Sequence, residues 1–148
     1  MAAKTLSGSW ALAINGGMKS VSFVNADGTT GKSIITGAAA GSQVYGGQIW
    51  SNESAANTWI FSFAPAAGTT TGTTQYQIST YLMASTNSDG VAYGAIIPAN
   101  MPGAMVDNAG NRYFQLDTND QIFVAPKTAV PTTAGKISVI TLNYRDFS

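Results

Sequence analysis

The sequence predicts an all-β fold, an antiparallel two-sheet β-sandwich of jelly-roll type. Apolar and polar residues alternate with a period of two along most of the chain, which is typical of strands with one buried face. Leucine and glutamate are scarce whereas threonine and glycine are abundant, and this composition disfavours helices. Turn signals recur roughly every 10–15 residues, a spacing typical of sandwiches and barrels. About nine short strands are therefore expected.

Turn signals bound the strands expected in the first third of the chain. Asn15-Gly16-Gly17 predicts a tight turn, and Asn25-Ala26-Asp27-Gly28 predicts a hairpin. Gly46-Gly47 interrupts an alternating run and predicts a bulge or a tight bend. The strands expected here are residues 9–14, 20–24, 32–36 and 44–50.

The rest of the chain continues in the same way. Residues 58–63 carry bulky side chains on both faces, which indicates a central strand. Loops are expected at residues 65–74, where Thr and Gly dominate, and at residues 98–103, where two prolines exclude a central strand. Turns are expected at residues 89–90, 107–110 and 117–120, and Val130-Pro131 is expected to interrupt the strand pattern. The remaining strands are residues 75–83, 91–97, 112–116, 121–124 and 136–144.

The period-two faces of the strongest strands also predict the core. On residues 75–83, for example, one face carries Tyr76, Ile78, Thr80 and Leu82. The residues expected to be largely buried are Trp59, Phe61, Ile78, Leu82, Phe114, Ile122, Val124, Val139 and Ile140.

Length and composition indicate one domain over residues 1–148, with residues 1–8 as a candidate N-terminal arm. The chain has 148 residues, and 45% of them are hydrophobic, enough to form a core. No apolar run approaches the length of a membrane span, so no membrane partner is expected. The first residues lack the apolar core of a signal peptide, so we expect synthesis in the cytoplasm.

Charge is the most unusual property of the composition. Charged residues make up 9% of the chain, and the formal net charge is zero. The basic residues are scattered one by one, so there is no basic stripe and no nucleic-acid partner is expected. A surface of small polar residues with few charges suits packing against other protein surfaces. The composition therefore favours a repeating assembly over a lone monomer.

Most catalytic chemistry is disfavoured by the residue types available. The chain has no cysteine and no histidine, so a thiolate nucleophile, a serine–histidine triad and a Cys/His zinc site are all excluded. Most of the seven carboxylates lie in turns rich in Gly or Asn, where Asp bonds its own backbone. We therefore expect no enzyme, with no catalytic, cofactor-binding or metal-binding residues. The turn carboxylates are Asp27, Asp89, Asp107, Asp117 and Asp120, and the others are Glu53 and Asp146.

Two weaker possibilities for ligand binding remain open. Asp117, Asn119 and Asp120 offer the hard oxygen donors that calcium prefers, but their spacing matches no known calcium loop, and a turn is favoured. Tryptophans on alternating strands can stack on sugars as in a lectin, although burial in the core is the more common role. The tryptophans are Trp10, Trp50 and Trp59.

The C-terminal third of the chain resembles small tailed-bacteriophage virion proteins, in a likeness that covers residues 49–147. The resemblance is carried by Leu116-Asp-Thr-Asn-Asp120-Gln-Ile122-Phe-Val124 and by Thr133-Ala-Gly135-Lys-Ile137-Ser-Val139-Ile140. In that family a turn with Asp leads to a strand, a loop and a closing strand. Upstream, residues 49–54 before the strand at 58–61 are similar to the loop-then-strand pattern of the same proteins. The family includes head decoration (cement) proteins and other accessory β-sandwiches of capsids and tails.

The resemblance implies a non-enzymatic structural protein of the virion, made in the host cytoplasm. Within that class it implies a capsid decoration protein that bridges capsid subunits as a small homo-oligomer, with a trimer favoured. The implied partners are the major capsid protein or another virion protein. Terminal residues 1–8 and 145–148 could supply arms to a neighbouring sheet edge. The alternative is a bacterial fimbrial subunit or a lectin-like adhesin, a class that normally needs a secretion signal.

Overall fold

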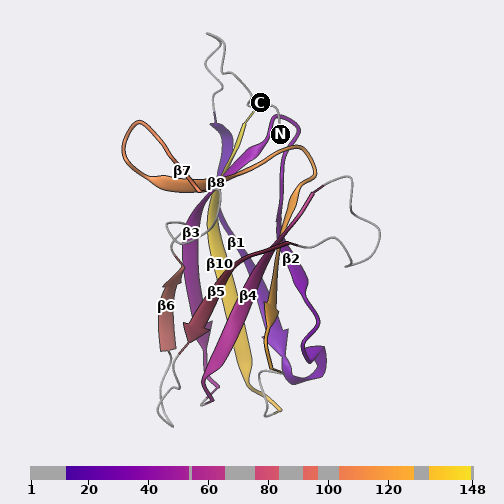
Figure 1. The fold of residues 1–148 in the computed structure, drawn as a ribbon. Helices are drawn as coiled ribbons and strands as arrows, with labels where there is room; N and C mark the ends of the chain where they lie inside the picture. The colour runs from indigo at the N-terminus through magenta and orange to yellow at the C-terminus, as the bar shows by residue number, and fades with distance from the viewer. Residues whose placement is uncertain are drawn as a thin grey trace.

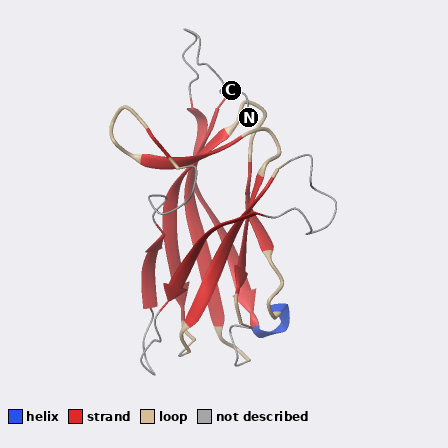
Figure 2. Cartoon of the chain, in the orientation of Figure 1, coloured by secondary structure: helices blue, strands red, loops and turns tan. Residues whose placement is uncertain are grey.

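The computed structural model describes residues 13–53, 55–65, 76–83, 92–96, 104–128 and 134–147. Strands make up most of these ranges, and one single-turn 3-10 helix, η1 (Asn25–Asp27), lies at one end (Figure 2). The strands form two antiparallel sheets that pack face to face (Figure 1). The predicted all-β, two-sheet sandwich is confirmed.

The two sheets differ in size. The six-stranded sheet contains, in spatial order, β1 (Ala13–Val24), β10 (Ile137–Phe147), β3 (Ser42–Ser51), β8 (Arg112–Leu116) and β7 (Met105–Val106), with β6 (Ala92–Ile96) also paired to β3. The four-stranded sheet contains β2 (Lys32–Thr36), β9 (Gln121–Pro126), β4 (Asn57–Ala64) and β5 (Tyr76–Met83). The short β7–β8 hairpin projects sideways from the sandwich (orange, Figure 1).

The pairing pattern is that of a jelly roll. Strand β1 pairs with β10, β2 with β9, β3 with both β8 and β6, and β4 with β5, so the pairs are nested like the two arms of one long hairpin. Two further pairs, β10 with β3 and β9 with β4, form where that hairpin rolls up on itself. The strand order of this chain therefore identifies the double-sheet architecture by itself.

The core lies between the two sheets and is almost entirely apolar. Each fully buried aliphatic or aromatic side chain contributes about 1.5–3 kcal/mol to stability. Ring pairs join strands of opposite sheets, with centroids 5.1 Å apart for Phe23 and Trp59 and 5.7 Å apart for Phe63 and Phe114. The buried core consists of Phe23, Ile34, Ile35, Val44, Ile49, Trp59, Phe61, Ile78, Phe114, Leu116, Ile122, Val124, Ile140 and Leu142.

Most of the predicted core residues are buried, but two are not. Seven are in the core: Trp59, Phe61, Ile78, Phe114, Ile122, Val124 and Ile140. Val139 is half-buried, because it lies on the outward face of β10 beside Trp50. The prediction for Leu82 is wrong, since this side chain is 70% exposed.

A break in the register of β5 explains the exposure of Leu82. Phe61 pairs with Ser79 but Ser62 pairs with Gln77, so Ile78 is an extra residue on its strand. Such a bulge reverses which face the following residues occupy. Leu82 consequently pairs with Thr58 on the outward face, although simple alternation from Ile78 placed it inside.

Two turn predictions near the N-terminus are also wrong. Strand β1 runs without interruption through Asn15-Gly16-Gly17, because each of these positions pairs with β10. The turn at residues 25–28 exists as η1 followed by Gly28 at φ 59°, but it is not a hairpin. The strands on either side of it, β1 and β2, belong to different sheets, so the turn carries the chain across the sandwich.

Other turn and strand predictions are confirmed where the structure describes them. The register of β3 against β10 shifts between Val44 and Gly46, and Gly46 has φ 114°, so the predicted bulge is present. Turns occupy residues 108–109 and 118–119. The central position of β4, between β9 and β5, is also confirmed. The loops and turns predicted at 66–74, 89–90, 98–103 and 130–131 lie outside the described residues.

Candidate interaction surface

The outward face of the six-stranded sheet carries very little charge. Directly opposed residues share a face, so the register identifies which side chains point away from the core. Among the described side chains that point outward from this sheet, Arg145 is the one that carries a charge. The outward residues described are Met18, Ser20, Ser22, Val24, Gln43, Tyr45, Gln48, Trp50, Tyr113, Gln115, Ile137, Val139, Thr141, Asn143 and Arg145.

Apolar side chains lie on this face as well. Trp50 and Val139 are directly opposed and both half-buried. Val24, which is 43% exposed, opposes Ile137 in the next outward row, and Met18 at the other end of β1 is 70% exposed. A sheet face that combines small polar groups with accessible apolar ones is suited to contact with another protein surface.

The outward face of the four-stranded sheet has the same character, and none of its described side chains is charged. Leu82, Ile60 and Phe123 give it an apolar component. Both flat sides of the sandwich are therefore nearly free of charge. The residues are Ser33, Thr36, Thr58, Ile60, Ser62, Ala64, Gln77, Thr80, Leu82, Gln121, Phe123 and Ala125.

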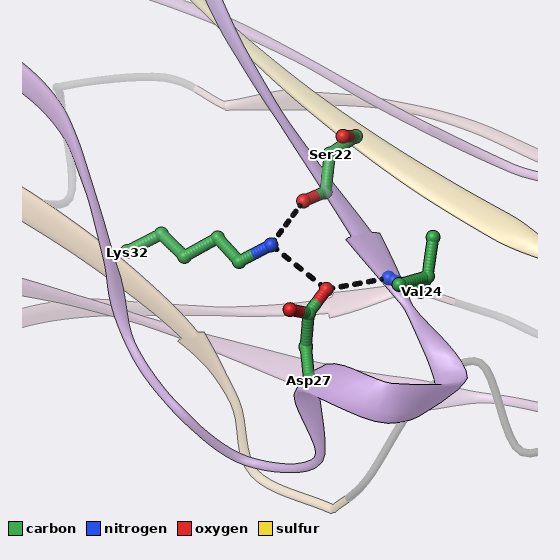
Figure 3. Close-up of polar contacts among 4 residues, drawn as sticks. All are labelled: Ser22, Val24, Asp27 and Lys32. Carbon is green, nitrogen blue, oxygen red and sulfur yellow. Dashed lines mark hydrogen bonds and ion pairs between the residues drawn. The ribbon is translucent and has the colours of Figure 1, made fainter.

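One ion pair closes the corner between the two sheets. The Nζ of Lys32 lies 2.8 Å from Oδ2 of Asp27 and donates to the backbone oxygen of Ser22 at 2.8 Å (Figure 3). The same Asp27 oxygen accepts the backbone N–H of Val24 at 2.7 Å. The hydrogen bond from Lys32 holds the pKa of Asp27 below its ordinary value of 3.8, and the Val24 N–H acts in the same direction. Ser22 and Val24 belong to the edge strand β1, so the pair covers backbone groups that would otherwise face an incoming strand.

Lys19 protects a second part of the same edge. It opposes the buried Leu142, so it lies on the inward side of β1, with its Nζ 4.8 Å from the ring centroid of Tyr144. Lys32 similarly lies 5.0 Å from the ring centroid of Phe23. Inward-pointing lysines on edge strands are a known means of preventing strand addition. The side of the sandwich formed by β1 and β2 is thus unsuited to β-augmentation. The expected C-terminal arm is wrong, because residues 145–147 belong to β10 and pair with β1 and β3. The expected N-terminal arm, residues 1–8, lies outside the described residues.

Arg145 lies in an aromatic cluster at one end of the six-stranded sheet. Its guanidinium carbon is 5.0 Å from the ring centroid of Tyr45, and the rings of Tyr45 and Tyr113 are 5.8 Å apart. The Tyr45 hydroxyl donates to Oε1 of Gln43 at 2.6 Å. Burial raises the pKa of Tyr45, and the nearby Arg145 charge partly opposes that rise. Met105 opposes Tyr113 in the β7–β8 hairpin and extends the cluster.

The turn carboxylates mostly bond their own turns. Asp107 Oδ1 accepts the backbone N–H groups of Ala109 and Asn111, and Oδ2 accepts the Asn111 side chain. The side-chain hydrogen bond from Asn111, followed by its backbone one, holds the pKa of Asp107 below 3.8. Asp120 Oδ2 accepts the backbone N–H of Asp117 at 2.9 Å.

The suggested calcium donors form a closed turn. Asn119 adopts φ 64°, and the backbone N–H of Asp120 bonds the oxygen of Asp117. Within the described ranges, no group of three or more acidic side chains gathers at a spot where a metal ion could bind.

The remaining carboxylates and the tryptophans considered for ligand binding do not gather at one site. Asp146 accepts the Ser42 hydroxyl at 2.5 Å, and Glu53 is buried at 3% exposure. Trp59 is in the core, whereas Trp50 lies on the outward face; Trp10 and Asp89 are outside the described residues. Sequence reasoning missed the Arg145 cluster, because its members come from three distant segments and only the fold brings them together.

Comparison with known proteins finds a likeness among solved structures alone. No protein-family model matches the chain, and no curated protein does either. Among solved structures, the chain is similar to the Eiger TNF of S. frugiperda, with 10% identity over 90% of this chain and 93% of that one and a TM-score of 0.41. No helix in the described ranges is long and apolar enough to cross a membrane.

Proposed function

We propose that this chain is a structural protein of a virion, in particular a capsid decoration protein that stabilises the head by bridging capsid subunits. It acts as a homo-oligomer, with a trimer favoured, and its partner is the major capsid protein or another virion protein. The observation that supports this proposal is the low charge of both outward sheet faces, where Arg145 is the one charged side chain among the described residues.

The mechanism is mechanical. A rigid sandwich with two contact faces can touch a neighbouring copy and a lattice subunit at the same time. Each contact of an oligomer is weak alone, but contacts at fixed spacing add through effective concentration. Separating two bridged capsid subunits then requires breaking these contacts as well, which raises the free energy of disassembly.

Cosedimentation tests this function. The protein is mixed with assembled particles that lack it and, in parallel, with dissociated capsid protein, each at low and high salt. We expect strong binding to the assembled lattice alone, because multivalency needs several sites at fixed spacing. Binding should change little with salt, since few charges take part. Equal binding to both forms, or a steep loss with salt, would exclude the decoration function.

A fimbrial subunit or lectin-like adhesin is the second candidate, and the position of Trp50 favours its lectin form. This side chain is half-buried on an outward sheet face, where an indole ring can stack on a sugar. A glycan array with the wild type and Trp50→Ala separates the two functions. Specific glycan binding that the substitution abolishes would favour the adhesin, while an absence of glycan binding would favour the virion protein.

A further inference from the structure

We propose that the Arg145 patch, defined as Gln43, Tyr45, Met105, Tyr113 and Arg145, is a docking site for a carboxylate-bearing segment of a protein partner. The inference deepens the proposed function and rests on it, because it assigns the lattice contact to one end of the six-stranded face. It also states the chemistry that the partner must supply, namely an Asp or Glu side chain in an apolar setting.

The guanidinium of Arg145 is held in place before any partner arrives. It stacks on Tyr45 at 5.0 Å, and Tyr45 is itself fixed on two sides, by its hydrogen bond to Gln43 at 2.6 Å and by the Tyr113 ring at 5.8 Å. An arginine stacked on an aromatic ring loses less side-chain entropy on binding than a free one. Its exposed fork of donors matches the two oxygens of a carboxylate.

Arg145 forms no ion pair with the described part of the chain. The ion pair found there is the distant one between Lys32 and Asp27. Asp107 attracts the Arg145 charge through a Coulombic interaction without forming an ion pair, and its oxygens already accept three hydrogen bonds from its own turn. A neighbouring protein that covers this face must therefore supply a negative group close to Arg145, because burying a charge without a close partner is strongly unfavourable.

The surroundings of Arg145 favour a protein ligand over a polyanion. The cation lies over the aromatic ring of Tyr45, and Met105, which is 41% exposed, opposes Tyr113 at the far side of the tyrosine pair. Tyr, Met and Arg are the residue types enriched in the buried centres of protein interfaces. Nucleic acids instead require several cations that track successive phosphates, and Arg145 is alone on the described part of this face.

A peptide titration tests the chemistry without any virion. The probes are acetyl-Leu-Asp-Leu-amide and its matched control acetyl-Leu-Asn-Leu-amide, and the readout is the Arg145 side-chain N–H signal in two-dimensional NMR. We expect the Asp peptide to shift this signal with an affinity of about 1 mM, and the Asn peptide to bind at least tenfold more weakly. Equal shifts from the two peptides, or none from either, would overturn the proposal.

Particle binding provides the second test. Arg145→Ala and Arg145→Lys are compared with Arg112→Ala, a matched control at an exposed arginine on β8, by cosedimentation and by sedimentation velocity of the free protein. We expect more than tenfold weaker particle binding for Arg145→Ala, a smaller loss for Arg145→Lys, and wild-type behaviour for Arg112→Ala, with the oligomeric state unchanged in all three. Unaltered particle binding by Arg145→Ala would refute the proposal, and so would a loss of self-association, which would make the patch a contact between copies.

The two tests separate the inference from the proposed function. If the wild type binds no particles but the Asp peptide still shifts the Arg145 signal selectively, the decoration function fails and the carboxylate site stands. If the wild type binds particles while the peptide and Arg145→Ala results are both negative, the function stands and the site fails.

Discussion

The side chain of Lys32 on β2 contacts residues of β1 and so links the two sheets at the edge of the sandwich. Its ammonium group lies over the ring of Phe23, pairs with the Asp27 carboxylate and donates a hydrogen bond to the edge strand β1. The side chains of Lys32 and Asp27 are 32% and 21% exposed, so solvent screens the pair and its Coulombic contribution is modest. Its larger effect is to occupy backbone groups that an incoming strand would need.

Removing the Asp27 charge should change how stability depends on pH. The folded-state pKa of Asp27 is depressed, so the carboxylate stabilises the protein fully above its unfolded pKa of about 3.9, and this contribution disappears as the pH falls through the folded value. Asp27→Asn should therefore be less stable than the wild type at pH 7, with a difference that shrinks between pH 5 and pH 2. Urea unfolding at these pH values measures it. A difference that stays constant over this range would contradict the assignment.

A matched pair of substitutions tests the core at the residue scale. Phe61 is fully buried between the sheets, and its replacement by Ala should cost about 3–5 kcal/mol of unfolding free energy. Leu82 is 70% exposed on the outward face, and Leu82→Ala should change stability by no more than about 0.5 kcal/mol. Equal losses from the two variants, measured by chemical denaturation, would show that the bulge at Ile78 is misplaced.

At the scale of strands, the sequence predicts where the strands lie better than it predicts how they pair with one another. Residues 32–36 are predicted and observed as a strand, and residues 57–64 and 121–126 extend the predicted ones by a few positions, because their alternation is unbroken. The turn predicted at Asn15-Gly16-Gly17 is absent, since local turn propensity yields to a complete ladder of pairing with β10. Leu82 was misplaced because a bulge has no reliable signature in a strand without glycine.

The sequence predicts the chemical character of the candidate interaction surface but not the residues that form it. Low charge and small polar residues are visible in the composition, but which surfaces are free of charge follows only from the strand register. The edge lysines were not predictable, because whether β1 is an edge strand depends on its pairing with β10, more than a hundred residues away. For the same reason the Arg145 patch, which joins residues 43–45, 105–113 and 145, could not be read from any single segment.

Close approach of two strands makes one glycine essential to the six-stranded sheet. A Cβ atom at Gly47 would overlap the backbone oxygen of Thr141 and come within 2.8 Å of the Cα of Leu142. Because both neighbours are backbone atoms of the central strand β10, they can give way only by distorting the sheet. Gly47→Ala should therefore cost about 1–3 kcal/mol or more.

Gly17 provides the control for Gly47 in the same sheet. A Cβ at Gly17 on β1 would meet nothing within 4 Å, so Gly17→Ala should leave stability unchanged or raise it slightly. Thermal and urea unfolding of the two variants measure the difference. Similar stability for both would mean that β3 and β10 are further apart than described.

At the scale of the whole molecule, charge is separated from the flat faces. Among the described residues, the acidic and basic side chains other than Arg145 lie in corners, turns, strand ends and on the inward side of edge strands. This distribution leaves two sides of the sandwich suited to burial, while the β1–β2 edge resists strand addition. Association through faces is consequently favoured over association through this edge.

Single charges placed on the faces should reveal which of them is in contact. Gln48→Glu introduces a charge at an exposed position of the six-stranded sheet, Thr80→Glu does so on the four-stranded sheet, and Asn108→Glu is the control in an exposed turn. None should lower the melting temperature appreciably, because all three positions are exposed in the free chain. An unpaired charge buried by a partner costs several kcal/mol, so the variant on a contact face should weaken self-association or particle binding more than tenfold. Sedimentation velocity and cosedimentation measure the two processes separately. If both face variants associate as tightly as Asn108→Glu, neither uncharged face is a contact surface, and the argument from charge to assembly fails.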